Sequence, residues 1–314
     1  MIPREVVSLI SRRRIVAEVR TETAMQALSV VDALAVGGVT TIEISLTIPG
    51  AREILSHLAT RQDVLVGAGA VLDGQQARDA IAAGARFIAS PVFNPELAAI
   101  CQEASVTCVL GALTPSEIIA AQRAGAEMVK LFPVEALGGP MYVRALLRQL
   151  THMSLQISGG FSAEHMIEYL DLPIRSLALG TLLTPRVLVE RANWQALTNR
   201  ARAFVDYVAN PHAYAAQFLA MMGIGAAPVA PGSLAAPVNP RIANIPTMPV
   251  PPKIASMLDP TVPDYPAAPP APSSRPGAGP APSSQPGVDP AARSGFHPWD
   301  SRPVELGDDE DWLR

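Results

Sequence analysis

The chain has 314 residues, a formal net charge of −4 and two cysteines. This charge, with no basic stripe along one periodic face, argues against a nucleic-acid surface. Cys101 and Cys108 have no histidine at metal-ligand spacing, so neither a disulfide framework nor a zinc site is expected. No apolar run reaches the roughly 18 residues that cross a bilayer, and the first ten residues are too charged for a signal peptide. We therefore expect a cytoplasmic protein with no membrane span.

Short apolar runs alternate with amphipathic stretches over the first two thirds of the chain. After a helix expected at 2–12, the predicted strands are 15–19, 40–46, 64–67, 86–90, 106–110, 127–132, 154–158 and 175–179. The predicted helices are 21–35, 50–59, 74–83, 95–103, 115–124, 141–150, 163–170 and 185–208. Apolar strands that alternate with helices form parallel sheets, and eight such units indicate an α/β protein with a (β/α)8 TIM-type barrel. A doubly wound open sheet is the alternative, which the absence of GxGxxG after the first strand disfavours.

The composition changes after residue 209. We expect the barrel to occupy residues 1–209 and a possible packed helix, over 213–222, with a linker to occupy 210–226. Residues 227–295 are rich in Pro, Ala, Gly and Ser, which cannot bury a core, so this segment is predicted to be a disordered spacer. Aromatic side chains return in residues 296–314. There Trp312, next to acidic residues, predicts a short motif that binds a protein partner.

One lysine lies inside a predicted strand. Of the 24 basic residues only Lys130 and Lys253 are lysines, and the rest are arginines. An arginine keeps its proton in a protein, whereas a lysine in an apolar site can act as a neutral amine. Lys130 is therefore a candidate for Schiff-base formation with a carbonyl substrate. A buried lysine that pairs with a carboxylate for structural reasons is the alternative that this residue alone leaves open.

Other candidate residues fall at the strand ends, where a barrel builds its active site. Glu43 lies between apolar neighbours on the second predicted strand. A partly buried glutamate has a raised pKa and can transfer protons near neutral pH, and the alternative is that it only neutralises Lys130. Glycine-rich turns at 158–160 and 180–181 end the last two strands, where many barrels bind a phosphate through backbone N–H groups.

Several motifs resemble, in order and spacing, those of the 2-keto-3-deoxy-6-phosphogluconate (KDPG) aldolase family, over residues 2–208. They are IEISLTIPGA from residue 42, VGAGAVLD at 66–73, SP at 90–91, LTPSE at 113–117, VKLFPVEALGG at 129–139, ISGG at 157–160 and LALGTLL at 177–183. The resemblance implies a homotrimeric class I aldolase that needs no metal and no cofactor. It also implies Lys130 as the Schiff-base lysine and Glu43 as the general acid and base.

The resemblance also implies which residues hold the substrate. The turns at Gly159-Gly160 and Gly180-Thr181 would hold its phosphate. The remaining expected substrate contacts are Thr47, Gly69, Pro91 and Ser158. The position of Thr47 is, in several members, an arginine that helps to hold the phosphate.

This chain departs from the family pattern at four further positions. Ala70 lacks a hydroxyl that would face the pyruvyl half of the substrate, and Val92 stands where the family has glycine. Leu110 and Ile157 stand where prolines are expected. Together these changes predict either an altered substrate or a weakened enzyme.

The expected reaction is cleavage of a 2-keto-4-hydroxy acid, KDPG, to pyruvate and glyceraldehyde 3-phosphate. The same imine chemistry also fits a 4-hydroxy-2-oxoglutarate aldolase or an oxaloacetate decarboxylase. A different class of function is a catalytically relaxed scaffold or cargo protein that its C-terminal segment recruits to a partner. Sequence alone leaves these alternatives, and the stereochemistry at C4, open.

Overall fold

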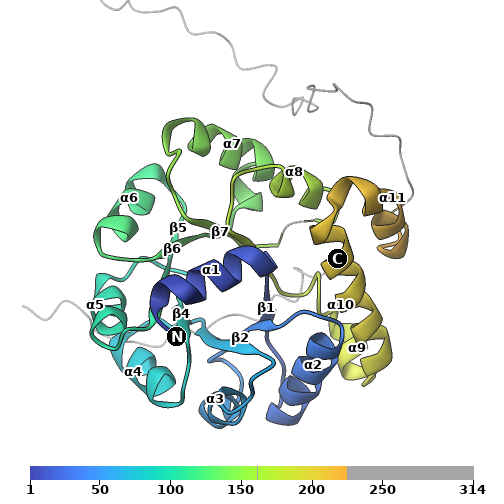
Figure 1. The fold of residues 1–314 in the computed structure, drawn as a ribbon, viewed down its shortest axis with the longest axis horizontal. Helices are drawn as coiled ribbons and strands as arrows, with labels where there is room; N and C mark the ends of the chain where they lie inside the picture. Colours follow the sequence, from blue (N-terminus) through green and yellow to red (C-terminus); the bar gives the residue numbers. More distant parts are fainter. Residues whose placement is uncertain (161, 225–314) are drawn as a thin grey trace, which may run out of the picture. The chain divides into compact units, whose positions relative to one another are not determined.

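The computed structural model describes residues 1–160 and 162–224. Eight parallel strands form a closed barrel in sequential order, and β8 closes the barrel by pairing with β1 (Figure 1). The strands are β1 (Ile15–Val19), β2 (Thr41–Ser45), β3 (Leu65–Gly69), β4 (Phe87–Ala89), β5 (Thr107–Ala112), β6 (Met128–Leu131), β7 (Leu155–Ile157) and β8 (Ser176–Leu179). The predicted (β/α)8 barrel is confirmed, and the open-sheet alternative is wrong.

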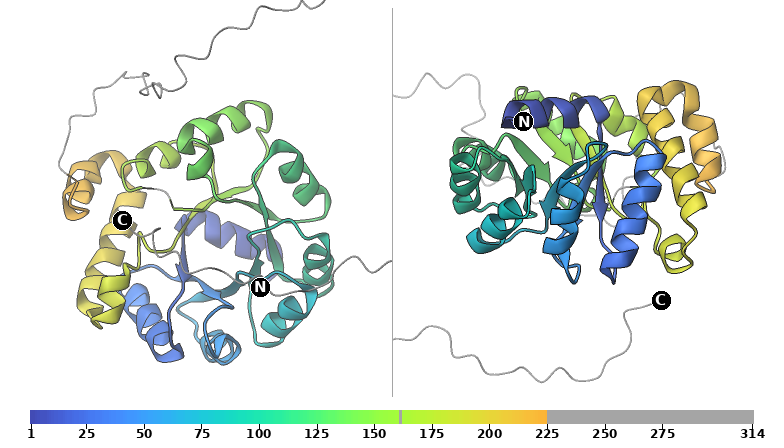
Figure 2. Two further views of the ribbon diagram at one scale, coloured as in Figure 1. Left: turned by 180° about the vertical axis from the view of Figure 1, so that it is seen from behind. Right: turned by 60° about the horizontal axis from the view of Figure 1, so that its bottom comes forward.

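Helices surround the barrel, as Figures 1 and 2 show. They are α1 (Pro3–Arg13), α2 (Ala24–Val36), α3 (Ala51–Ala59), α4 (Gly74–Ala82), α5 (Pro95–Glu103), α6 (Pro115–Arg123), η1 (Glu135–Leu137), α7 (Gly139–Gln149), α8 (Met166–Leu170), α9 (Arg186–Glu190), α10 (Trp194–Ala209) and α11 (Pro211–Met221). Within the described residues, no helix is long and apolar enough to cross a membrane.

The predicted helical region over 185–208 consists of two helices, because the chain breaks between α9 and α10. Ala192 has a left-handed backbone with φ of 50°, which no helix interior accepts. Asn193 then caps α10, since its side chain accepts a hydrogen bond from the backbone N–H of Ala196. Beyond α10, Phe218 of α11 stacks on Tyr207 with ring centroids 4.0 Å apart. The predicted spacer at 227–295 and the predicted binding motif at 296–314 lie outside the described residues.

Alternate residues of each strand face the barrel interior, because side chains of a strand alternate between its two faces. The N-terminal half of this interior is apolar, with Val16, Leu65, Phe87, Val109, Met128 and Ala178 packed against Val6 and Ile10 of α1. Gly67 makes room for this layer, since a Cβ there would lie 2.5 Å from the Phe87 ring. Two residues further along their strands, Glu18 and Lys130 face the same interior one layer nearer the C-terminal end.

Helix α1 closes the N-terminal end of the barrel. Its residues Val6 and Ile10 are four apart, so they lie on one face, and both are fully buried. Figure 1 shows α1 lying across the barrel opening, and the side view in Figure 2 shows it at one end only. A ligand can therefore reach the interior only from the opposite end, where the strands end.

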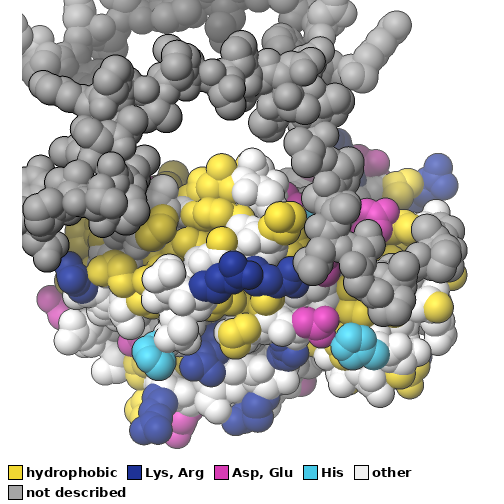
Figure 3. All heavy atoms as spheres, turned by 90° about the horizontal axis from the view of Figure 1, so that it is seen from above, with side chains coloured by type: hydrophobic (Ala, Val, Ile, Leu, Met, Phe, Trp, Pro, Cys, Tyr) yellow, Lys and Arg dark blue, Asp and Glu magenta, His cyan; other side chains and the backbone are white. Residues whose placement is uncertain are grey.

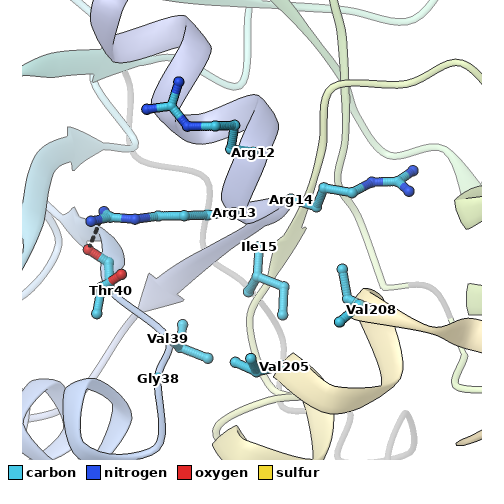
Figure 4. A pocket seen from close by; sticks show the side chains of 10 residues that line it. Arg12, Arg13, Arg14, Ile15, Gly38, Val39, Thr40, Val205 and Val208 are labelled. Carbon is cyan, nitrogen blue, oxygen red and sulfur yellow. Dashed lines mark hydrogen bonds between the residues drawn. The ribbon is translucent and has the colours of Figure 1, made fainter.

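A cavity of about 370 Å³ lies beside the C-terminal end of α1 and is lined by three consecutive arginines (Figure 4). Their side chains point in different directions. Arg12 donates to the hydroxyl of Ser8, Arg13 to the carbonyl of Thr40, and Arg14 to the carbonyl of Leu170. Because each guanidinium is bound to a different part of the chain, the three do not converge on one ligand position. Positive charge here also complements the dipole at the end of α1.

Candidate active site

A cavity of about 890 Å³ opens at the C-terminal ends of the strands. This is within the size range of small-molecule sites. Eight of the ten predicted site residues line it, namely Glu43, Pro91, Lys130, Ser158, Gly159, Gly160, Gly180 and Thr181. Residues that sequence reasoning did not select also line it, among them Glu18, Arg20, Ser45 and Arg200.

Lys130 lies at the floor of this cavity, with only 5% of its side chain exposed. Its Nζ donates to Glu43 Oε1 at 2.8 Å, to Glu43 Oε2 at 3.0 Å and to Glu18 Oε1 at 2.9 Å. An ammonium group has three N–H donors, so these two carboxylates satisfy all of them. The barrel therefore holds the lysine in one fixed position, with its nitrogen facing the cavity.

The electrostatics of the three groups depend on burial and on their mutual contact. Burial raises the pKa of Glu43 to about 7, although Lys130 opposes this change. Burial alone would lower the pKa of Lys130, but the charges of Glu43 and Glu18 outweigh it and raise that pKa above its ordinary value. The resting site therefore holds a charged ammonium beside a glutamate that gains and loses its proton near neutral pH.

The absence of a side chain at two glycines makes room for two residues that line the cavity, Glu43 and Pro91. A Cβ at Gly69 would lie 2.2 Å from Glu43 Oε1, so only glycine lets the carboxylate occupy its place. Gly69 is not itself a lining residue of the cavity, and it acts through Glu43. Pro91 lines the cavity directly. Its backbone passes so close to Gly111 that a Cβ there would lie 2.1 Å from the Pro91 carbonyl carbon.

Thr47 does not line the cavity, unlike the neighbouring Ser45. The two hydroxyls are hydrogen-bonded, with 2.8 Å between Oγ of Ser45 and Oγ1 of Thr47. Thr47 follows β2 in a turn, so its short side chain bonds back to the strand end. Of these two hydroxyl residues only Ser45 lines the cavity, and the contact between Thr47 and substrate stays a prediction.

Glu18 is the main residue that sequence reasoning missed. It pairs in register with Glu43 across β1 and β2. Its Oε1 accepts hydrogen bonds from Lys130 and from the hydroxyl of Ser158, the latter also at 2.9 Å. The available signal was the same as for Glu43, a carboxylate inside an apolar strand.

The predicted glycine turns lie side by side at the cavity wall. Gly159 has φ of 103°, and a Cβ on it would lie 2.6 Å from Cα of Pro133. Both the backbone conformation and the close approach therefore require glycine at this position. Gly160 also has a positive φ, of 72°, but a Cβ there would meet open space. At the second turn, the carbonyl of Gly180 accepts from the hydroxyl of Thr184, which fixes the turn that carries Thr181.

Of the four departures from the family pattern, only Ala70 lines the cavity. It has a left-handed backbone with φ of 57°, which is unusual for a residue other than glycine. Val92 is exposed, whereas Leu110 and Ile157 are fully buried. The change with a direct route to a bound ligand is therefore the loss of a hydroxyl at Ala70.

Arginines lie on the outer wall of the cavity. Arg186 forms ion pairs with Glu22 and Glu190, and Arg200 donates twice to the carbonyl of Leu182. Arg20 follows β1 and also lines the cavity. Among the described residues, no group of three His, Cys, Asp or Glu side chains is arranged to hold a metal ion. An anionic substrate would therefore meet positive charge at the mouth and an ammonium at the floor.

The protein is a closed (β/α)8 barrel with a buried lysine amine at the end where a ligand can enter. The family model for KDPG and KHG aldolase matches residues 6–200. The chain belongs to this aldolase family.

Individual relatives agree with the family match. A 2-dehydro-3-deoxy-phosphogluconate aldolase of Treponema pallidum is 37% identical over 54% of this chain and 81% of its own length. One of the same name from Haemophilus influenzae is 28% identical over 65% of this chain and 97% of its own. Among solved structures, KDPG aldolase of Legionella pneumophila, which holds pyruvate as a covalent carbinolamine, matches with a TM-score of 0.59 and 28% identity. That match covers 63% of this chain and 96% of the Legionella chain.

Proposed function

We propose that the protein is a class I aldolase that cleaves KDPG to pyruvate and glyceraldehyde 3-phosphate through an imine on Lys130. The observation that carries this proposal is the Lys130 ammonium in contact with Glu43, 2.8 Å away, at the floor of an otherwise closed barrel. An amine held beside an acid and base group is the arrangement that carbonyl chemistry needs. The Legionella relative, which captures pyruvate covalently, supports the same assignment.

In the proposed mechanism, neutral Nζ of Lys130 attacks the C2 carbonyl carbon of the substrate. Glu43, with its pKa near 7, then protonates the departing hydroxyl of the carbinolamine, which leaves as water. The resulting iminium withdraws electrons from C3. Glu43, now a carboxylate, accepts the proton of the C4 hydroxyl while the bond between C3 and C4 breaks. The aldehyde leaves, Glu43 returns this proton to C3 of the enamine, and water hydrolyses the resulting imine to release pyruvate.

The outer half of the cavity is the proposed site of the substrate phosphate. Gly159, Gly160, Gly180 and Thr181 line the cavity, and all four follow the ends of β7 and β8. Glycine lets an oxyanion approach the backbone closely. Positive charge on the arginines of the outer wall would favour the same end. This assignment favours a phosphorylated six-carbon acid over the shorter 4-hydroxy-2-oxoglutarate.

Borohydride trapping tests the imine. Incubating the protein with pyruvate and borohydride should add the reduced pyruvyl group to Lys130, located by peptide mass spectrometry. Lys130→Arg keeps the charge but cannot form the adduct, so it should fold and yet lose all activity. No adduct at saturating pyruvate would overturn the proposal. It would leave the scaffold reading, in which Lys130→Arg changes only stability.

Turnover of three compounds tests the substrate. We expect the highest kcat/KM for KDPG, a lower value for 4-hydroxy-2-oxoglutarate, and slow decarboxylation of oxaloacetate. All three would share the same trapped imine. A higher kcat/KM for either unphosphorylated compound would contradict the phosphate assignment while it leaves the imine chemistry in place.

We also propose that the chain assembles as a homotrimer. Large apolar side chains stay exposed where β6 leads into α7, including Leu137 at 47% and Met141 at 62%. Figure 3 looks onto the side on which α7 and α8 lie and shows hydrophobic patches between charged groups. Such patches favour a protein contact. Light scattering should give a trimer that Met141→Glu weakens and that Met25→Glu, on exposed α2, does not. A monomeric wild type would contradict this assignment.

A further inference from the structure

Glu18 is placed differently from Glu43, although both bind the same ammonium. The Glu43 side chain is 5% exposed, and both of its oxygens accept hydrogen bonds from Lys130. Glu18 is 29% exposed and uses one oxygen, Oε1, for both Lys130 and Ser158. Its Oε2 lies 3.6 Å from where a Cβ of Gly180 would be, at the turn that ends β8. One carboxylate is therefore enclosed with the lysine, and the other connects the lysine to the open cavity.

Imine formation needs both a base for the Lys130 proton and an acid for the departing hydroxyl. Glu43 alone is poorly suited to both tasks. Lys130 must lose a proton before its nitrogen can attack a carbonyl. In the proposed mechanism Glu43 must then supply a proton to the departing hydroxyl, so it has to be in its acid form at that moment. A Glu43 that had just accepted a proton from Lys130 could do so, but the resting Glu43 already holds a proton for part of the time near pH 7. A protonated carboxyl cannot accept the lysine proton.

We propose that Glu18 is a second catalytic acid and base group, which accepts the proton of the Lys130 ammonium and so produces the nucleophilic amine. The inference rests on the proposed imine function. The proton moves from Nζ to Oε1 across the existing 2.9 Å hydrogen bond. This step turns an ammonium and a carboxylate into an amine and a carboxylic acid, so charge is conserved. Amine attack and loss of water then take one proton from Glu43, which becomes a carboxylate beside the iminium.

The reverse path resets the site. When water releases the product, Nζ regains its proton from Glu18, and Glu43 regains the proton that it gave. Ser158 holds Glu18 in position for both directions, because its hydroxyl donates to the same Oε1. The partial exposure of Glu18 also allows it to exchange protons with solvent. Glu18 thus handles the proton of Lys130 and Glu43 the protons of the substrate, whereas a single carboxylate would have to do both in sequence.

The charged groups around Glu18 are few. On β2 and β6 they are Glu43 and Lys130. Arg20 is two residues further along the chain from Glu18, and Arg200 lines the same cavity. The remaining rim charges are Glu22, Arg186 and Glu190, which pair with one another. A change at Glu22 therefore removes a cavity carboxylate without touching Lys130, which makes Glu22→Gln a matched control.

The test is the rate of imine formation, followed as borohydride-trapped pyruvyl adduct on Lys130 against time and pH. Glu18→Gln keeps the shape and can still accept from Ser158, but it cannot take a proton. We expect trapping about a hundredfold slower than in the wild type near neutral pH, the lower end of the usual scale for a lost acid or base. Glu18→Asp, which keeps a carboxylate, should recover part of this rate, and Glu22→Gln should match the wild type. Thermal unfolding confirms that each variant is folded.

If Glu18 acted only through its charge, Glu18→Gln would change the trapping rate in the opposite direction. Removing the Glu18 charge takes away one of the two groups that raise the pKa of Lys130, so more neutral amine would be present and trapping would be faster. Equal or faster trapping by Glu18→Gln therefore overturns the inference. If Glu18→Gln fails to fold, Glu18→Ala takes its place, since it also lacks a proton acceptor, and equal or faster trapping by that variant overturns the inference as well. Absence of trapping in the wild type itself would instead overturn the proposed function.

Discussion

Glu18 and Glu43 occupy paired positions on adjacent strands, and both accept hydrogen bonds from the single nitrogen Nζ of Lys130. Two like charges at neighbouring positions repel each other, and the presence of Glu18 adds to the rise in the pKa of Glu43. The ammonium between them offsets this repulsion. The three charged groups therefore form one hydrogen-bonded cluster, in which the raised pKa of Glu43 makes stability depend on pH.

The first prediction concerns stability. The folded state holds the proton of Glu43 up to a pKa of about 7, whereas the pKa of a glutamate in the unfolded chain is 4.5. Because the folded state binds this proton more tightly, the contribution is fully present below about pH 4.5 and is lost as pH rises through about 7. The free energy of unfolding should fall by about 3 kcal/mol across this window from Glu43. Urea unfolding at several pH values measures it.

Glu43→Gln removes the titrating group and should flatten the pH dependence of stability in that window. Glu22→Gln is the control, because Glu22 is an exposed carboxylate paired with Arg186. It should leave the slope unchanged. A wild-type protein whose unfolding free energy rises over the same pH range would show that the pKa of Glu43 is not raised.

The second prediction concerns the stability of Glu18 and Glu43 when their shared partner Lys130 is removed. Lys130→Met fills a similar volume but leaves Glu18 and Glu43 facing each other without the ammonium. Breaking a buried ion pair on one side costs about 3 to 5 kcal/mol. We expect a loss of this size above pH 7 and a smaller one at acid pH, where Glu43 is protonated. Adding Glu43→Gln to Lys130→Met should restore stability. An equal cost in the single and double variants would mean that the carboxylates do not interact.

The third prediction separates shape from backbone strain. Gly69→Ala places a methyl group where Glu43 Oε1 now lies, so Glu43 must move away from Lys130. We expect kcat to fall on the order of a hundredfold, as for a lost acid or base. Gly125→Ala is the control, since Gly125 has φ of 100° but open space around a Cβ. It should cost about 1 kcal/mol of stability without loss of activity. Full activity in Gly69→Ala would show that Glu43 tolerates displacement.

Much of this site could be predicted because a charge inside an apolar strand is expensive and therefore conspicuous. Lys130 and Glu43 each stand alone in such a run, and barrel geometry places strand ends together. Glu18 has the same setting in β1. Its role depends on closure of the barrel, because only the pairing of β8 with β1 brings Glu18 to Ser158 and Lys130. No local pattern shows which carboxylate a distant lysine will meet.

Two further features depend on structure that the sequence does not display. Thr47 was expected to contact the substrate because of the arginine at this position in several family members, and in the structure its hydroxyl is hydrogen-bonded to that of Ser45. The break between α9 and α10 falls at Ala192, and an alanine followed by an asparagine carries no glycine or proline signal. The side chain of Asn193, which accepts a hydrogen bond from the N–H of Ala196, marks where α10 begins.

The last prediction concerns the phosphate end of the cavity. Thr181→Val keeps the side-chain shape and removes a hydroxyl that lines the cavity beside Gly180. The loss of one hydrogen bond to a charged group costs about 1.5 to 3 kcal/mol, which is about a 10- to 150-fold rise in KM for KDPG. Cleavage of unphosphorylated 4-hydroxy-2-oxoglutarate should be unaffected, because that substrate does not reach the turn. Steady-state kinetics with both substrates on one protein preparation gives the ratio directly.

Gly159→Ala should act in the same direction by a different route. Its methyl group would lie 2.6 Å from Cα of Pro133, so the whole turn must shift and its backbone N–H groups with it. Gly160→Ala meets open space and keeps the turn against Pro133, so the neighbouring glycine serves as control for backbone strain alone. KM for KDPG should therefore rise more in Gly159→Ala than in Gly160→Ala, with kcat for the unphosphorylated substrate nearly constant in both. Equal losses on the two substrates would place the phosphate elsewhere in the cavity, toward the arginines of the outer wall.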